Sequence, residues 1–469
     1  MSISQRTDAD DSQEVGHLAL SLLIILLGSF VAPLLMHSAT LAIPAIASDL
    51  NLSAEQISLF TLLQILGSVV FVLPAGKLAD KFGRRRMFCL GLLIAGLTSA
   101  MAGLASTDWA MIASRGLSGM GGAFIFASAI ALLMSVPPEE QKVRVMGIYI
   151  SIAYLGVVLG PVFGGLVLEF LHWRWVFFIP SLILLTLAAL GFLVLKWERY
   201  GDKATRIRLL DFSLYAASLS VIAVGVFDAG EPSGQLLLLI GLFFFIAFCW
   251  FQTKRRDPLL QVRMFAESRT FSILSSSIFL TSFGLMALPF ILTLYFQYLK
   301  GLDAKTTGFI MLVQALCTAV IASKSGWLSK NFRPRYLILS GISLFVTAYW
   351  MLAFINADTS ITWMVVTLTV LGIGFGLMDT QIIHTAMSSV DDKYIGSASA
   401  VINGMRTLGG FFGLSLMSYL IGKHLGNVPI VPEVYPQLGK VLDTFLLSNG
   451  VVASLTLFLL MYGVITRKR

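Results

Sequence analysis

The chain has 469 residues, of which 57% are hydrophobic and only 12% are charged. Soluble domains carry about 25% charged residues, so this composition excludes an ordinary soluble domain. The net charge of +8 does not indicate nucleic-acid binding, because the Lys and Arg residues gather in short loops between long apolar runs.

Fourteen apolar segments follow one another along the chain. An apolar stretch of about 18 residues is long enough for a membrane-spanning helix. We therefore predict an all-α polytopic membrane protein with 14 transmembrane helices. The segments cover residues 18–47, 55–76, 87–106, 109–136, 143–170, 174–195, 209–228, 235–252, 270–299, 306–328, 336–356, 361–388, 396–422 and 442–465.

If the chain crosses the membrane once at each segment, most of its positive charges lie on one side of the membrane. Of the 33 Lys and Arg residues, 26 fall in the termini and in every second loop, five fall in the other loops, and two lie within segments. Cytoplasmic loops are enriched in Lys and Arg, so both termini are predicted to be cytoplasmic. Residues 1–17 are polar and acidic and lack the features of a signal peptide, which predicts a cytoplasmic tail.

Residues 76–86 carry six charges between two apolar segments. A charge costs about 2.5–3.5 kcal/mol at the centre of a spanning helix, so we predict a tight cytoplasmic loop whose two glycines permit a turn. Asp80 is expected to cap a helix or to pair with Arg84 or Arg144. Such a pair either latches one end of a transporter shut or belongs to an ordinary positively charged loop.

Arg115 lies inside an apolar segment and has several glycines as neighbours. An arginine in a span is costly and usually faces an interior cavity or a partner, and glycines let another helix approach closely. The alternative is that Arg115, about two turns from the outer end, extends its charge to the membrane surface.

The next segment carries Gly156, Gly160 and Gly164 at a spacing of four, together with Pro161 and Gly165. Glycines four apart form one smooth stripe for tight packing, and a proline inside a helix removes a hydrogen bond and bends the helix. Two interpretations follow: a sliding seam between two halves of the molecule, or simple close packing of helices.

Asp379 is a carboxylate within a predicted span, and such residues are functional candidates. A proton carrier must exchange its proton near neutral pH, which burial and neighbouring charge can bring about. The alternative is a structural pair, for example with Arg406. His37 is the only ionisable side chain of the first segment; it either takes part in proton coupling or makes a satisfied polar contact.

The second half of the sequence repeats features of the first at an offset of about 250 residues. Parallel six-helix repeats are typical of secondary transporters that rock around a central site. We therefore predict a six-helix bundle at residues 18–196, two inserted helices at 197–256, and a second six-helix bundle with a short cytoplasmic tail at 257–469. The matched residues are Gly76, Leu78, Phe82 and Arg85 with Gly326, Leu328, Phe332 and Arg335, and Gly147, Gly160 and Gly164 with Gly396, Gly409 and Gly413.

The sequence shows no phosphate-binding loop, no nucleotide domain and no metal-ligand spacing. Its three cysteines each fall inside a predicted span and are interpreted as small apolar packing residues. We therefore expect no enzyme activity, no cofactor and no metal, and an energy source in an ion gradient or in the gradient of the substrate itself.

Several motifs resemble the major facilitator superfamily. Residues 76–86 resemble its loop signature, and Arg115 with Gly119 resembles a motif that the family ties to proton coupling. The glycine stripe with Pro161 resembles the antiporter motif of its exporters. Residues 173–177, 256–265 and 295–299 narrow the resemblance to the fourteen-helix drug:proton antiporter family. The loop-signature residues are Gly76, Asp80, Gly83, Arg84 and Arg85, and the antiporter-motif residues are Gly156, Gly160, Pro161, Gly164 and Gly165.

The sequence departs from this family at two positions. The family usually carries an acid in the first span, nine residues before a proline, and here Leu35 holds that place before Pro44. His37 or Asp379 would then have to supply the protonatable group. In the second half, Lys330 stands where the loop aspartate would repeat.

The resemblance implies a proton-coupled exporter of amphipathic compounds that works by alternating access as a monomer in a bacterial inner membrane. Its expected partners are a small amphipathic substrate, protons and the lipid bilayer, and not nucleic acid. Because the first span lacks the acid, anionic or zwitterionic substrates such as lipids or bile-salt-like acids remain an alternative. An uncoupled facilitator, a proton symporter and a non-transporting receptor are further alternatives.

Overall fold

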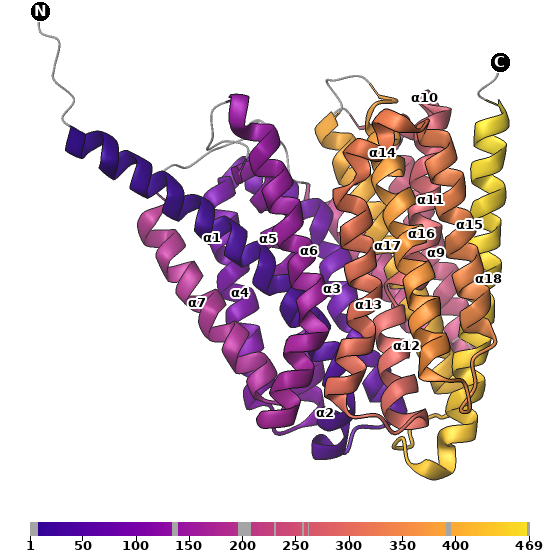
Figure 1. Ribbon diagram of the computed structural model, residues 1–469. Helices are drawn as coiled ribbons and strands as arrows, with labels where there is room; N and C mark the ends of the chain where they lie inside the picture. The colour runs from indigo at the N-terminus through magenta and orange to yellow at the C-terminus, as the bar shows by residue number, and fades with distance from the viewer. Residues whose placement is uncertain are drawn as a thin grey trace, which may run out of the picture.

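The computed structural model describes residues 8–133, 139–195, 208–228, 231–255, 258–260, 262–390 and 395–466. Within these ranges the elements are helices, and no β-strand occurs apart from one isolated antiparallel bridge between Ser53 and Pro429. The predicted all-α class is confirmed. Figure 1 shows long helices that run side by side from one end of the molecule to the other.

The helices fall into three stretches of chain. The first contains α1 (Asp8–Leu41), α2 (Ile43–Leu50), α3 (Ala54–Phe82), α4 (Arg84–Leu104), α5 (Asp108–Leu133), α6 (Glu139–Phe170) and α7 (Trp175–Val194). The second contains α8 (Leu209–Phe227) and α9 (Pro232–Thr253). The third contains α10 (Arg263–Glu267), α11 (Arg269–Leu285), α12 (Leu288–Leu294), the π-helix η1 (Tyr295–Leu299), α13 (Ala304–Ser323), α14 (Ser325–Asn331), α15 (Pro334–Ala353), α16 (Ile361–Met387), α17 (Ile395–His424), the 3-10 helix η3 (Pro432–Val434) and α18 (Tyr435–Thr466).

Thirteen helical segments in the described ranges are long and apolar enough to cross a membrane. The remaining long helix, α17, has 30 residues and is less apolar because it contains Asn403, Arg406 and several glycines. Each of the fourteen predicted segments overlaps with one of these long helical stretches.

The N-terminal segment differs from its prediction at both ends. α1 begins at Asp8, inside the predicted tail of residues 1–17, and the span breaks at Ala42, after which the short α2 follows. α2 ends at Leu50, and the next residue, Asn51, has a left-handed φ of 50°, a conformation that Asn adopts more readily than most residues. The side chain of Ser53 then caps α3 by accepting a hydrogen bond from the backbone N–H of Gln56.

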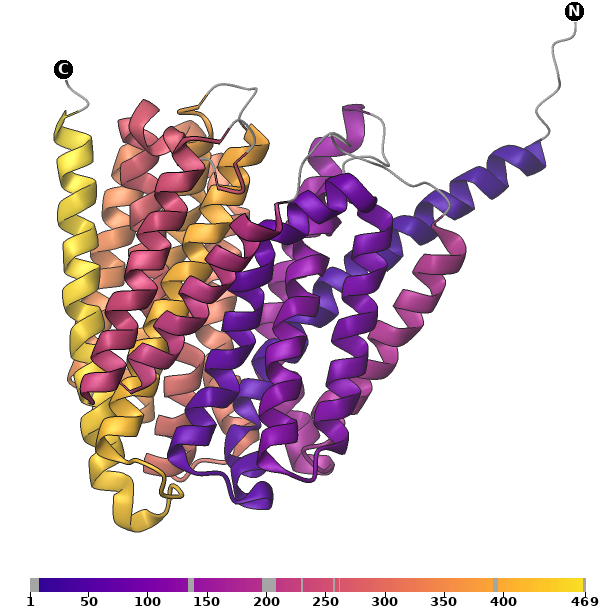
Figure 2. The same ribbon diagram turned by 180° about the vertical axis from the view of Figure 1, so that it is seen from behind.

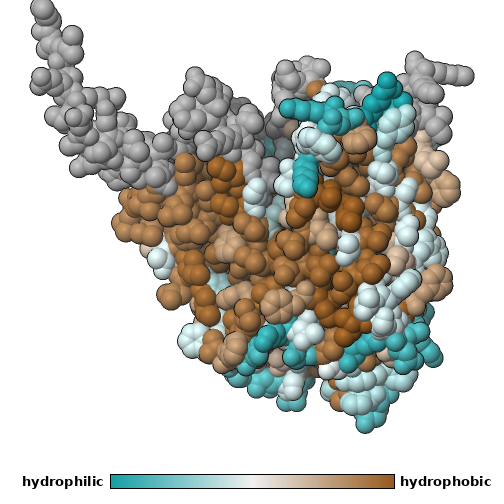
Figure 3. Space-filling model, viewed as in Figure 1, coloured by the Kyte–Doolittle hydropathy of each residue, from teal (hydrophilic) through white to brown (hydrophobic). Residues whose placement is uncertain are grey.

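α1 begins and α18 ends at the same end of the molecule, at the top in Figure 1. We call this end the terminal face, and the end where α2 lies the opposite face. Figure 3 shows a broad hydrophobic band between them, with hydrophilic residues at the opposite face and on part of the terminal face. A lipid bilayer covers a band of this kind.

Matching helices of the two repeats meet through matching glycines. Gly160 and Gly164 of α6 lie directly against α1, and the matching Gly409 and Gly413 of α17 lie directly against α11. In each case a Cβ atom would lie within 3.1 Å of a main-chain atom of the neighbour. Small residues let helices approach this closely, so the repeat in the sequence corresponds to a repeat in packing.

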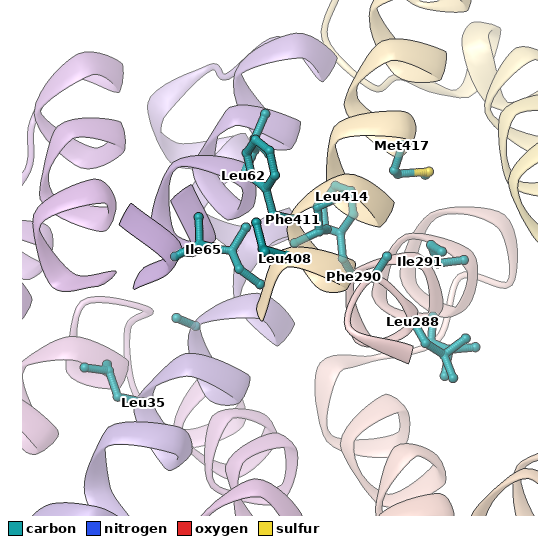
Figure 4. Close-up of a cluster of buried hydrophobic side chains, with 14 of the residues drawn as sticks. Leu35, Leu62, Ile65, Leu288, Phe290, Ile291, Leu408, Phe411, Leu414 and Met417 are labelled. Carbon is teal, nitrogen blue, oxygen red and sulfur yellow. The ribbon is translucent and has the colours of Figure 1, made fainter. Parts of the chain in front are cut away.

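An apolar contact joins the helices of the first stretch to those of the third. Figure 4 shows Ile65 of α3 beside Leu408 of α17, with Leu62 and Phe411 one turn away. All four side chains are almost completely buried. Burial on this scale contributes about 1.5–3 kcal/mol for each large side chain, so α3 and α17 form a stable part of the seam.

The helices α8 and α9 pack on one another, and α8 also contacts α3 and α17. Figure 2 shows the molecule from the side on which this pair lies. The Tyr215 hydroxyl donates a hydrogen bond to the Val69 carbonyl oxygen at 2.9 Å, which ties α8 to α3. The leucines of α9 are largely exposed, so this helix turns most of its surface to lipid. The predicted borders of the insert, 196–197 and 256–257, lie outside the described residues.

Candidate functional site

Asp379 and Arg406 form an ion pair inside the C-terminal helices. Nη2 of Arg406 donates to both carboxylate oxygens of Asp379, at 2.8 and 3.1 Å. Tyr154 of α6 lies close to both members of the pair. Side chains of α6, α16 and α17 therefore converge on one carboxylate, and α6 comes from the first stretch of chain.

The glycines of α16 explain why Asp379 is so deeply enclosed. Gly372 and Gly376 face carbonyl oxygens of α13, and Gly374 faces the Gly341 carbonyl of α15 at 2.8 Å from an ideal Cβ position. Helices can approach α16 closely on two sides, and Asp379 is only 7% exposed. Its charge is compensated by Arg406, and removing one partner of such a buried pair costs about 3–5 kcal/mol.

Arg115 is fully enclosed between α3, α5 and α7. Its Nη2 donates to the Gln64 side-chain oxygen, and its guanidinium lies 4.8 Å from the Phe60 ring centroid and 5.7 Å from that of Phe177. The side chain is 1% exposed, so the alternative of extension to the membrane surface is wrong. Nε and Nη1 have no hydrogen-bond partner among the described residues. Arg115 thus packs within the first stretch of helices, away from Asp379.

His37 and the glycine stripe lie at the contact between α1 and α6. A Cβ on Gly160 would lie 2.6 Å from the Cβ of His37, and one on Gly164 would lie 3.0 Å from the Ser38 backbone. His37 is half-buried. The structure places it against the stripe and not beside Asp379.

The other side of α6 faces α13. The Pro161 carbonyl lies directly against Gly308, and a Cβ on Gly165 would lie 2.8 Å from the Lys305 Cα. The predicted antiporter motif therefore has two contact surfaces, one on α1 and one on α13.

Two polar contacts fasten the helices at the opposite face. Gln297 of η1 donates through Nε2 to the Leu41 carbonyl oxygen at 3.0 Å, and Lys305 Nζ donates to Glu169 Oε1 at 2.9 Å. Each contact joins the first stretch of chain to the third. The Lys305–Glu169 pair is partly exposed, so its own contribution is about 0–1 kcal/mol.

The tight loop predicted at residues 76–86 is mostly helix. α3 continues to Phe82 and α4 begins at Arg84, so Gly83 alone separates them. Gly83 has φ 107°, which side-chain-bearing residues rarely adopt. Gly76 lies inside α3 and does not form the turn, so the expected turn role of this glycine is wrong.

The charges of this motif bind neighbouring helix ends at the terminal face. Arg84 donates to Asp80 Oδ1 at 3.0 Å across the break, and Arg85 Nη2 donates to the Phe192 carbonyl oxygen of α7 at 2.6 Å. The expected pairing of Asp80 with Arg84 is observed. The side chain of Arg144, the other predicted partner, lies outside the described residues.

A cavity of about 420 Å³ opens at the opposite face within the C-terminal helices. Its wall includes Tyr295, Tyr435 and Asp443. It lies between η1, α18 and the connection from α15 to α16, and therefore away from the Asp379–Arg406 pair.

Sequence reasoning missed Tyr154, Gln297 and Glu169. Tyr154 precedes Gly156 by two residues, which places it roughly on the side of α6 away from α1. This offset from Gly156 was the one feature of the sequence that pointed to Tyr154. The residues that these three contact lie far away in the sequence, so no local sequence pattern predicts the contacts.

Comparison with known proteins gives one family for most of the chain. Residues 25–414 match the family model described as Major Facilitator Superfamily. The chain is 29% identical over 411 residues to the puromycin resistance protein pur8 of Streptomyces alboniger, covering 86% of this chain and 80% of that protein. It is 28% identical over 407 residues to the cephamycin export protein CmcT of Amycolatopsis lactamdurans, covering 83% and 82%. It is 24% identical over 406 residues to the multidrug transporter protein MdtP of Bacillus subtilis, covering 85% and 74%.

The fold is also similar to solved structures. A bacterial homolog to the human lysosomal transporter Spinster, in an inward-facing and unoccupied conformation, aligns with a TM-score of 0.70 at 16% identity. The alignment covers 95% of this chain and 96% of that one. The two chains share an overall helical arrangement.

Proposed function

Since the chain belongs to the Major Facilitator Superfamily, we propose that it exports amphipathic compounds in exchange for protons. It is a membrane-embedded transporter and not an enzyme. The observation that carries the proposal is the Asp379–Arg406 pair, a buried carboxylate and its counter-charge in contact with a helix from the other half of the chain.

The proposed moving parts are residues 18–196 and 257–469, with residues 197–256 as an insert. The helices of the first part pack on one another, and so do those of the last part. Transporters built from two such repeats alternate by rocking one against the other around a site near the midplane. The contacts of Gln297 and Lys305 would have to break for the opposite face to open.

We assign the terminal face to the cytoplasm and the opposite face to the outside, because most Lys and Arg residues lie in loops on the terminal side. The relatives in Streptomyces, Amycolatopsis and Bacillus are bacterial, which supports a place in a bacterial cytoplasmic membrane. We propose that the transporter works as a monomer.

In this mechanism Asp379 holds the proton and Arg406 responds to it. An ionised Asp379 is held by the guanidinium, and a proton on its carboxylate removes the attraction between them. Arg406 is then available to another partner, and substrate binding that restores the pair would expel the proton. His37 and Arg115 lie elsewhere, so they would act on helix packing and not on this exchange.

The substrate class is proposed from the names of relatives and from the charges in the spans. The relatives are named for puromycin resistance, cephamycin export and multidrug transport. The first span carries Leu35 and no acid, while Arg115 and Arg406 add positive charge. Anionic or zwitterionic amphiphiles such as lipids or bile-salt-like acids are therefore the second candidate class.

Inside-out membrane vesicles with an imposed pH gradient test this function. Export coupled to protons appears as substrate uptake that depends on the gradient, with proton release when substrate is added. Flux without proton movement would indicate a facilitator, and absence of flux would indicate a receptor. A growth-inhibition screen across cationic, neutral and anionic amphiphiles, with and without expression, identifies the substrate class.

A further inference from the structure

The cavity at the opposite face is bounded by side chains that are held in place. The Tyr295 hydroxyl donates to the Asn356 carbonyl oxygen at 2.8 Å. The ring of Tyr435 lies edge-on to that of Tyr298, with the ring centroids 6.2 Å apart. These contacts join η1 to the α15–α16 connection and to α18. The cavity is therefore preformed, and a ligand loses little binding free energy in ordering its walls.

The cavity has the size and the lining of a small-molecule site. Its volume of about 420 Å³ lies within the range of about 300–1,000 Å³ that is usual for ligand pockets. Tyrosine rings and aliphatic side chains, including Leu299 and Leu442, form most of the wall. A ligand with an aromatic ring suits this wall, because pairs of rings gain contact energy beyond their buried area.

Two opposite charges stand on one side of the wall. Lys440 and Asp443 of α18 both line the cavity and are both exposed, and residues three apart share one face of a helix. Neither side chain forms an ion pair within the described part of the chain. A ligand with an ammonium and a carboxylate pairs with both charges. A ligand with only one charge leaves the other charge of the site desolvated and unpaired, which costs affinity.

One wall of the cavity also takes part in the seam between the halves. Tyr295 and Leu299 are about one turn apart in η1, and both line the cavity. Gln297 lies midway between them and therefore on the other side of η1, where its Nε2 donates to the Leu41 carbonyl oxygen of α1 at 3.0 Å. π-Helices are rare and frequently occur at functional sites. η1 thus stands between the cavity and a contact that closes the opposite face.

We propose that this cavity binds a small zwitterion with an aromatic body, which enters from the outside and holds η1 in place. The ammonium of the ligand pairs with Asp443, its carboxylate pairs with Lys440, and its ring packs on Tyr295 and Tyr435. A ligand that binds the closed arrangement better than the open one shifts the population toward the closed one. Gln297 then keeps its contact with α1, and export slows. This rests on the proposed function for the export itself and for placing the opposite face outside.

Isothermal titration calorimetry with the purified protein in nanodiscs tests the binding. The probe is the dipeptide phenylalanyl-phenylalanine in mildly acidic buffer, where its amino group is charged. The N-acetylated dipeptide carries only the negative charge, and the dipeptide amide carries only the positive one. We expect the free dipeptide to bind at least about tenfold more tightly than either analogue, since each analogue loses one charge-assisted contact. Absence of dipeptide binding, or equal affinity for all three compounds, overturns the proposal.

Two variants assign the two charges of the ligand. Lys440→Met should weaken binding of the free dipeptide to the level of the amide and leave the amide unaffected. Asp443→Asn should weaken it to the level of the acetylated form and leave that form unaffected. Lys423→Met is the matched control at the same face, because Lys423 lies over the Tyr419 ring and outside the cavity; it should keep all three affinities. If both cavity variants bind the dipeptide as tightly as the parent, the probe binds elsewhere and the proposal is wrong.

Inside-out vesicles test the effect on export and separate it from the proposed function. Their lumen corresponds to the outside of the cell, so they are loaded with the dipeptide or with its amide. Uptake of the substrate found in the growth-inhibition screen should slow as the luminal dipeptide concentration rises, and Lys440→Met should remove this effect. Uptake that the luminal dipeptide leaves unchanged contradicts the role of η1. Vesicles without uptake under any condition contradict the proposed function, whereas charge-selective binding to the purified protein still supports the site.

Discussion

At the scale of single residues, Asp379 is the group on which the proposed proton coupling depends. Its side chain is 9% exposed and that of Arg406 is 20% exposed. Two charges in such surroundings are stable only as a pair, and a change that removes one charge leaves the other uncompensated. An amide of the same shape keeps an oxygen that accepts from Arg406, which offsets part of the cost of the lost charge, so the protein should still be expressed.

Asp379→Asn is expected to abolish proton release on substrate binding while expression stays intact, because the amide cannot carry the proton. The measurement uses purified protein in weakly buffered solution with a pH-sensitive dye. Asp358→Asn is the control, since Asp358 is an exposed carboxylate in the α15–α16 connection of the same half. Normal proton release from Asp379→Asn would remove Asp379 from the mechanism.

Asp49 gives a second prediction, on stability against pH. Its Oδ2 accepts hydrogen bonds from Trp173 Nε1 and Arg174 Nη1, both at 2.9 Å, and these bonds lower the pKa of Asp49 below its ordinary value of 3.8. A carboxyl whose folded pKa is depressed stabilises the fold above its ordinary pKa and loses that contribution as pH falls through the folded pKa. Because Asp49 is 40% exposed, solvent screening keeps the contribution at about 0–1 kcal/mol.

Asp49→Asn should therefore lower the melting temperature slightly at neutral pH. The difference from the parent protein should vanish well below pH 3.8, where both side chains are neutral. Thermal unfolding in detergent across this range checks the prediction. A difference that grows on acidification would have the wrong sign.

At the scale of elements, α6 is the helix that packs against α1 on one side and against α13 on the other. Its glycines pack on α1, while Pro161, Gly165 and Tyr154 meet helices of the other half. A helix with such tight contacts on two sides tolerates little added volume, because overpacking forces neighbouring side chains and backbone to shift.

Gly160→Ala should destabilise the protein by about 1–3 kcal/mol, since the new methyl group would lie 2.6 Å from the Cβ of His37. Gly422→Ala is the matched control, because nothing lies within 4 Å of a Cβ at that position of α17. Melting temperatures in the same detergent compare the two. Equal stability of the two variants would mean that the stripe is not tightly packed.

The end of α3 offers a kinetic prediction. Asp80 and Arg84 link α3 to α4, and their side chains are 38% and 26% exposed, so the pair stabilises the fold by about 0–1 kcal/mol. Asp80→Asn should leave the melting temperature nearly unchanged and slow transport, because the link at the terminal face is weakened. Initial uptake rates in inside-out vesicles measure this, and an unchanged turnover would contradict it.

At the scale of the whole molecule, the sequence predicted the helices but not the contacts between distant ones. Hydropathy and positive charge are local patterns, and they located every long helix. The continuation of α3 through residues 76–82 was not predicted, because charged side chains at a helix end reach water without a loop. The Asp379–Arg406 pair was among the hypotheses, since both charges lie in spans. The position of Tyr154 near this pair depends on how α6 packs against α16 and α17, which no periodicity in the sequence predicts.

The central claim is that the two halves alternate while Asp379 exchanges a proton for substrate. Purified protein in liposomes tests it by comparing substrate exchange at equal pH with uphill accumulation driven by a pH gradient. The parent protein should perform both, and Asp379→Asn should keep exchange and lose accumulation, because the halves still rock but no proton is carried. Undiminished accumulation by Asp379→Asn would contradict the account.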